Sequence, residues 1–189
     1  MLRRRQGGGG PLGGGGRLGG GGPGGEVPAN VYQMRQRMFS IGDDYWIENG
    51  AGQRMFKVDG KALRIRSTLS IEDASGRELY KIQEKMVRIR DTMDIEGPNG
   101  SIASVKKAMI TPLRERFTVD LPSGGQWNIQ GNITDHEYEI SGPNGKVATV
   151  GKRWFRLTDT YGVEVEPGQD DGLALAVAVV VDQISHPRG

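Results

Sequence analysis

The chain of 189 residues contains no cysteine and only two histidines. Without cysteine it can form no disulfide, offer no thiolate to a metal or a reaction, and carry no palmitoyl anchor. A histidine-based metal site or a serine–histidine–acid triad would have to use His136 or His186, and neither lies in a recognisable motif. We therefore expect a protein that is not an enzyme and that uses no cofactor.

We expect no secretory signal at the start of the chain. Its first residues, MLRRRQGGGG, are basic, but no apolar stretch of about 7–15 residues follows them. We expect the protein to be cytoplasmic.

Residues 7–25 are almost all glycine, and such a segment cannot bury enough apolar surface to offset its backbone entropy. We interpret residues 1–29 as a disordered basic tail and residues 30–189 as one folded domain. Four of the 25 basic residues and one of the 23 acidic residues lie before position 27, which leaves 21 basic and 22 acidic residues after it. The folded part is thus about neutral.

The tail contains arginines next to runs of glycine. This composition resembles the RGG segments of RNA-binding proteins, in which arginine neutralises phosphate and stacks on bases. The tail has only four arginines and no aromatic residue among them. We therefore favour a flexible extension. Interaction with nucleic acid or protein through this tail remains the alternative function.

From residue 45 onward, a pattern of two alternating apolar segments around a glycine-containing corner repeats. In MDIEGPNGSIASV, Met93 and Ile95 project to one face of a strand while Asp94 and Glu96 project to the other. This rhythm predicts consecutive β-hairpins. The corner glycines are Gly52, Gly76, Gly100 and Gly124 at intervals of 24 residues, and then Gly145.

In four of the five units an additional apolar residue follows the corner and precedes a pair with period two. These residues are Met55, Leu79, Ile102 and Val147.

A sixth, shorter hairpin is predicted in FRLTDTYGVEVEPG, with Phe155 and Leu157 before its corner and Val163 and Val165 after it. With further strand material in residues 32–39 and 62–69, the count reaches about twelve antiparallel strands in meander order. So many strands rarely stay an open sheet, because exposed edges aggregate. The sequence therefore predicts a mainly β fold, a closed barrel of about twelve strands.

A barrel this wide leaves a hole that side chains alone cannot fill. Near the end of the chain, nine consecutive apolar residues, LALAVAVVV, follow Asp170 and Asp171 and precede Pro187. The two acids suit a helix start and the proline suits its end. We predict a hydrophobic helix over about residues 170–185 in the centre of the barrel, with an additional buried strand as the main alternative because several residues are β-branched valines. The run is too short to span a membrane.

Six hairpins followed by a short hydrophobic helix resemble the LURP-one-related family, a branch of the tubby-like superfamily that is related to phospholipid scramblases. The resemblance covers about residues 32–186 and implies a twelve-stranded barrel around a C-terminal helix. It also implies one of several roles: tubby proteins bind phosphoinositides, scramblases are linked to calcium-dependent lipid movement, and LURP-one relatives mostly lack an assigned activity.

A lipid role needs cations that can meet several phosphate oxygens. Three arginine pairs with period-two spacing and one lysine pair are the candidates, although the near-neutral domain also fits a merely solvated barrel face. They are Arg64, Arg66, Arg88, Arg90, Lys106, Lys107, Arg114 and Arg116.

Glu164, Glu166, Asp170 and Asp171 are weaker candidates for a calcium site, because capping and solvation explain them equally well. The sequence as a whole predicts a non-catalytic binding or scaffold module that recognises anionic phospholipid at a membrane surface or binds a protein partner.

Overall fold

The structure is a computed structural model. It describes residues 27–35, 44–60, 62–63, 66–84, 92–111, 114–155 and 160–186. Residues 1–26 of the expected tail lie outside this part.

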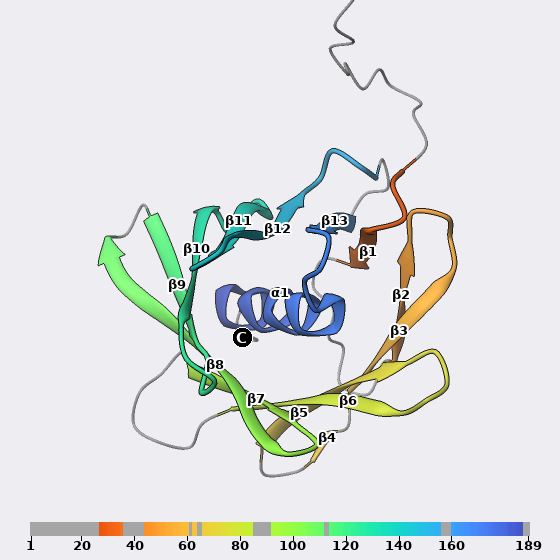
Figure 1. The fold of residues 1–189 in the computed structure, drawn as a ribbon, viewed down its shortest axis with the longest axis horizontal. Coiled ribbons are helices and arrows are strands. Elements are labelled where there is room, and N and C mark those ends of the chain that lie inside the picture. Colours follow the sequence, from red (N-terminus) through yellow and green to blue (C-terminus); the bar gives the residue numbers. More distant parts are fainter. Residues whose placement is uncertain are drawn as a thin grey trace, which may run out of the picture.

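The described residues form thirteen strands and one helix (Figure 1). The strands are β1 (Val31–Arg35), β2 (Tyr45–Asn49), β3 (Arg54–Asp59), β4 (Ala62–Leu63), β5 (Arg66–Asp73), β6 (Glu78–Glu84), β7 (Thr92–Gly97), β8 (Gly100–Thr111), β9 (Arg114–Asp120), β10 (Gln126–Asn132), β11 (Glu137–Gly142), β12 (Gly145–Gly151) and β13 (Thr160–Val165).

Twelve of these strands close into an antiparallel barrel. Each strand pairs with its neighbour in the chain from β5 to β13 and from β1 to β3, and the β1–β13 and β3–β5 pairings complete the ring. The two-residue β4 pairs with β5. The predicted closed barrel is therefore confirmed.

Five of the six strand pairs are the expected hairpins, and their five corner glycines all have positive φ. The sixth pair differs from the expectation. β13 is bordered by β12 on one edge and by β1 on the other. Both edges of β13 are thus occupied, because the two ends of the domain pair with each other. Leu157 of the predicted hairpin lies outside the described residues. Val163 and Val165 are buried in β13, as expected.

The additional apolar residues after the corners are β-bulges. Met55, for example, falls between the paired residues Ile47–Phe56 and Glu48–Arg54, so it has no partner across the strand. The same register shift occurs in β5–β6, β7–β8 and β11–β12. A bulge increases local twist and bends the strand, which helps a sheet to close.

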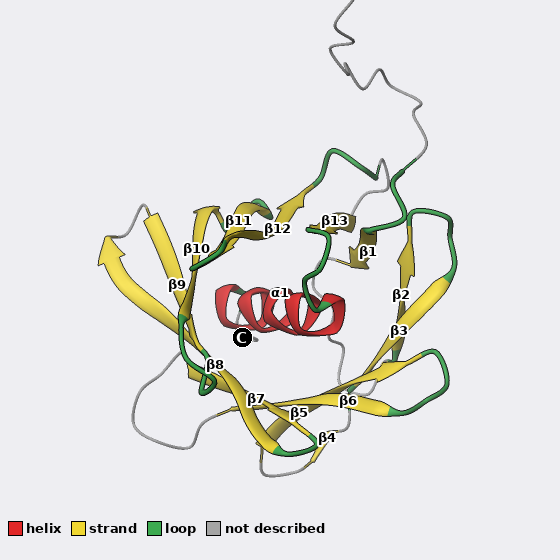
Figure 2. Ribbon diagram, in the orientation of Figure 1, coloured by secondary structure: helices red, strands yellow, loops and turns green. Residues whose placement is uncertain are grey.

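The helix α1 (Asp171–Ser185) lies inside the barrel, surrounded by strands (Figure 2). Residues 174–180 of the helix are all 0% exposed, so the helix packs against the wall on every side. Its apolar side chains and the inward-facing residues of the strands form one core. The predicted central helix is confirmed, and the alternative of an additional strand is wrong.

Candidate functional site

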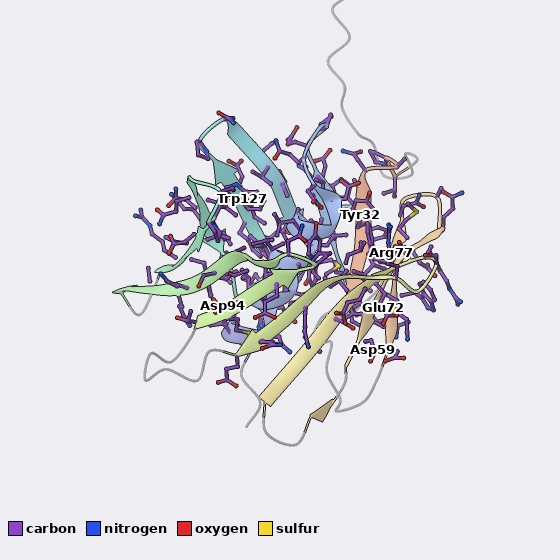
Figure 3. The ribbon with its side chains drawn as sticks, turned by 60° about the horizontal axis from the view of Figure 1, so that its bottom comes forward. Tyr32, Asp59, Glu72, Arg77, Asp94 and Trp127 are labelled. Atoms are coloured by element: carbon purple, nitrogen blue, oxygen red, sulfur yellow. The ribbon has the colours of Figure 1, made fainter. Side chains whose placement is uncertain are left out.

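The outer wall carries most of the described charges, and many of them pair with each other. Asp59 and Glu72 lie on one side of the barrel (Figure 3), where Nζ of Lys57 is 4.0 Å from a carboxylate oxygen of each and 2.6 Å from Asp44. Arg77 binds Asp73 in the adjacent corner at 3.0 Å. A cation without an ion-pair partner is therefore a better indicator of an anion-binding site than the number of cations on this surface.

The structure brings two of the predicted basic residues together on the outer face of β8 and β9. Arg116 is paired across the strands with Ala108, and Lys106 lies two residues before Ala108 on the same face. Both side chains are exposed. Among the described residues, Arg116 has no ion-pair partner, whereas Nζ of Lys106 donates to Asp120 at 2.6 Å. That ammonium, together with the Gln126 amide, lowers the pKa of Asp120 below its usual value.

The other predicted basic residues are not gathered in this way. Lys107 is half-buried on the inner face, opposite Phe117, with its ammonium 6.0 Å from the centre of that ring. Arg66 and Arg114 begin strands β5 and β9. Arg64, Arg88 and Arg90 lie outside the described residues.

The four acidic residues proposed for calcium each have another partner. Oδ1 of Asp170 caps α1 by accepting from the N–H of Leu173 at 2.9 Å, and its Oδ2 accepts from the Tyr80 hydroxyl at 2.6 Å. Asp171 accepts from Tyr32 at 2.7 Å. Glu164 forms an ion pair with Arg153 at 3.2 Å, and Glu166 forms one with Lys146 at 2.7 Å.

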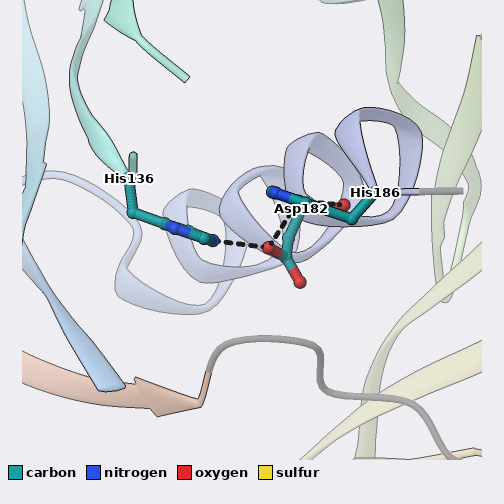
Figure 4. A group of neighbouring side chains, drawn as sticks. All are labelled: His136, Asp182 and His186. Carbon is teal, nitrogen blue, oxygen red and sulfur yellow. Dashed lines mark hydrogen bonds and ion pairs between the residues drawn. The ribbon is translucent and has the colours of Figure 1, made fainter. Parts of the chain in front are cut away.

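The opposite end of the helix carries a buried polar cluster that sequence reasoning missed (Figure 4). Nε2 of His136 lies 2.6 Å from Oδ1 of Asp182, and Nδ1 of His186 lies 3.4 Å from the same oxygen. The side chains of His136 and Asp182 are 5% and 3% exposed, whereas that of His186 is 26% exposed. The two imidazole rings are parallel, with their centres 5.2 Å apart.

A tight turn between β10 and β11 directs His136 inward. The residue has a φ of +55°, which is unusual for a residue other than glycine. Its N–H donates to the carbonyl of Ile133 at 3.0 Å, and the Asn132 amide donates to Asp135 at 2.6 Å within the same turn. The backbone thus holds the imidazole against the last turn of α1.

Tyrosines surround this cluster. The ring of Tyr161 stacks on His136 with the ring centres 4.4 Å apart. Burial, and then the charge of Asp182, raise the pKa values of Tyr45, Tyr138 and Tyr161 far above the ordinary value. The hydroxyls of Tyr138 and Tyr161 and Nδ1 of His136 are buried without a hydrogen-bond partner among the described residues.

The clustering could not be read from spacing, because His136 and Asp182 are 46 residues apart. The only local signal is the spacing of four residues between Asp182 and His186, which would bring two side chains together if both lay near one helix end. Neither histidine lies in a motif of its own, so the sequence gives no sign that the two imidazoles lie together.

A comparison with protein families matches residues 30–182 to the LURP-one-related family. The chain belongs to this family. It is 26% identical over 153 residues to the uncharacterized protein YxjI of Bacillus subtilis, a match that covers 81% of this chain and 92% of that protein.

The fold is also that of a solved structure. The LURP-one-related chain superposes on the X-ray structure of a protein from Arabidopsis thaliana with a TM-score of 0.62 and 16% identity, covering 85% of this chain and 95% of that one. At this identity the likeness shows the fold alone. Within the described residues, no helix combines the length and the apolar character needed to cross a membrane.

Proposed function

We propose that this LURP-one-related domain is a non-catalytic binding module that recognises anionic phospholipid headgroups, including phosphoinositides, through the outer face of β8 and β9. Under this proposal the protein is cytoplasmic and binds peripherally to a membrane. The observation that carries the proposal is the pair of exposed cations, Lys106 and Arg116, on one face of neighbouring strands.

Two features support an outer rather than an inner site. The interior is filled by α1, whose central residues are inaccessible to solvent. Arg116 has no ion-pair partner among the described residues, so its guanidinium is available for a bidentate contact with phosphate. Lys106 can exchange its exposed bond to Asp120 for a phosphate oxygen, since an exposed ion pair contributes little stability.

The test is co-sedimentation of the full chain with vesicles of phosphatidylcholine, with and without phosphatidylinositol 4,5-bisphosphate. A cation near an anionic surface contributes about 1 kcal/mol, so Arg116→Ala should weaken binding about fivefold. Lys106→Ala should do the same, and binding should fall as salt is raised.

Lys146→Ala is the matched control. Lys146 is also exposed and paired with a carboxylate, but it lies on β12, which three strands separate from β8. Its loss should leave binding unchanged. Failure of the unaltered chain to sediment with phosphoinositide vesicles, or equal losses in all three variants, would rule out this site. A parallel variant with Arg88→Ala and Arg90→Ala tests the predicted cations outside the described residues.

A further inference from the structure

We propose that His136, Asp182 and His186 form a binding site for one divalent transition-metal ion of the zinc class at the C-terminal end of α1. Two imidazole nitrogens and one carboxylate oxygen are a donor set that Zn²⁺ and its first-row neighbours prefer, whereas calcium and magnesium prefer oxygen ligands alone. The three donor atoms, one from each residue, all lie within 4.8 Å of one another.

One of the present distances already matches the value that a metal ion requires. Metal–ligand bonds of about 2.0–2.1 Å in a tetrahedral site separate the ligand atoms by about 3.3 Å. The Asp182 Oδ1 to His186 Nδ1 distance is 3.4 Å, while the His136 Nε2 to Asp182 Oδ1 distance of 2.6 Å must lengthen. Because the two rings are now parallel, one must also turn to aim its lone pair at the ion. His186 is the ring with room to do so, since it caps the helix and is partly exposed.

A simple hydrogen-bonded pair accounts for only part of the arrangement. Oδ1 of Asp182 lies 2.6 Å from Nε2 of His136, and Nδ1 of His186 lies 3.4 Å from the same oxygen and 3.3 Å from the Asp182 carbonyl oxygen, so both imidazoles converge on one residue. Asp182 lies in the last turn of α1, and His186 is the C-cap residue four positions later, so the chain brings the two side chains together at the helix end.

The surroundings also suit a cation. Asp182 is a buried carboxylate whose charge acts on the neighbouring phenols of Tyr138 and Tyr161. Those two hydroxyls lack partners among the described residues, and they can accept from or donate to a water bound at the fourth position of the ion. The partial exposure of His186 gives the ion a route from the end of the barrel.

An ion here would join the turn after β10 to the last turn of α1. Since the unfolded chain does not hold these three groups together, binding should favour the folded state. The expected consequence is a melting temperature that rises with the concentration of Zn²⁺. This inference is independent of the lipid proposal, because none of the three donor residues belongs to the outer face of β8 and β9.

Titration of the full chain with Zn²⁺ by calorimetry, without a histidine tag, tests the proposal. The chain has no cysteine and no other histidine, so any histidine-dependent binding must come from this cluster. We expect one ion per chain and an increase of several degrees in the melting temperature that EDTA reverses.

His186→Ala is the decisive variant, because this partly exposed residue can change without disturbing the core. It should lose Zn²⁺ binding at least tenfold while its melting temperature in EDTA stays near that of the unaltered chain. His136→Asn should also lose binding. Asp135→Asn, an exposed acid in the same turn, is the matched control and should bind normally. Absence of stoichiometric binding, or binding by His186→Ala equal to that of Asp135→Asn, would overturn the proposal.

Discussion

Nε2 of His136 lies 2.6 Å from Oδ1 of Asp182 and thereby connects the barrel wall to the end of the central helix. At the other end of the helix, the hydroxyl of Tyr80 in β6 lies 2.6 Å from Oδ2 of Asp170. Apolar packing fills the space between these two contacts. Polar contacts thus attach both ends of the helix to the wall. They fix the position of the helix along the barrel, which hydrophobic packing alone does not determine.

The His136–Asp182 pair should contribute a measurable coupling energy. His136→Asn, which tolerates the positive φ at this position, removes the closest partner of a buried carboxylate and should cost about 3 kcal/mol of unfolding free energy. Urea unfolding in EDTA measures this cost in the absence of metal.

Combining that change with Asp182→Asn completes a double-mutant cycle. The double variant should be more stable than the sum of the single changes predicts, by about 1–3 kcal/mol. Strict additivity would show that the two side chains do not interact.

Stability should fall at alkaline pH because all five tyrosines have raised pKa values in the folded protein, chiefly through burial. A raised folded-state pKa favours the protonated phenol. Its contribution is therefore complete below the ordinary tyrosine value of 10.0 and is lost as pH rises through the folded-state value. Urea unfolding between about pH 8 and pH 11 should show this decline, with tyrosinate absorbance appearing only as the protein unfolds.

Tyr80→Phe is the control for this dependence, since it removes one titrating group that binds Asp170. Its stability should decline less steeply with pH than that of the unaltered chain. The same slope in both proteins would exclude Tyr80 as a contributor.

The centre of the helix should not accept a charge. Val177 is 0% exposed, so Val177→Asp places a carboxylate without a partner in the core at a cost of several kcal/mol and should prevent folding. Val177→Ala, which only removes apolar contacts, should cost about 1–3 kcal/mol and remain folded. Circular dichroism and thermal melts distinguish these outcomes. A cooperatively folding Val177→Asp variant would show that the helix is not buried in solution.

The corner at Gly145 should depend on backbone conformation rather than on space. Its φ is +115°, and a Cβ atom added there would meet no atom within 4 Å. Gly145→Ala should therefore cost about 1–2 kcal/mol through strain alone. Asn144→Ala, in the same exposed corner, should change stability by less than about 0.5 kcal/mol in the same urea experiment. Equal effects would contradict this explanation.

Local patterns predicted much of this fold. The repeated corners fix five hairpins, and the residues that follow four of them are the observed bulges, because the register of a hairpin depends on nearby residues alone. The helix could be predicted from its N-cap and its all-apolar run, since a wide barrel must be filled.

Contacts between distant segments could not be predicted in this way. The sequence suggested a local partner for β13, but closure of the ring gives that edge to β1. The cluster around Asp182 likewise depends on a contact between segments 46 residues apart, the turn before β11 and the last turn of the helix. For the basic residues, the period-two pattern identified an outer face at Arg116 but could not show that Lys106 shares it.

The central claim is that anionic lipid headgroups bind this domain on its outer wall and not in its interior. Amide chemical shifts of the isotopically labelled full chain, measured while a soluble inositol phosphate headgroup is added, test the claim most directly. We predict saturable shifts that centre on Lys106 and Arg116 in β8 and β9 and that are absent from α1. Shifts confined to α1 and its inward-facing neighbours, or no saturable shifts, would contradict it.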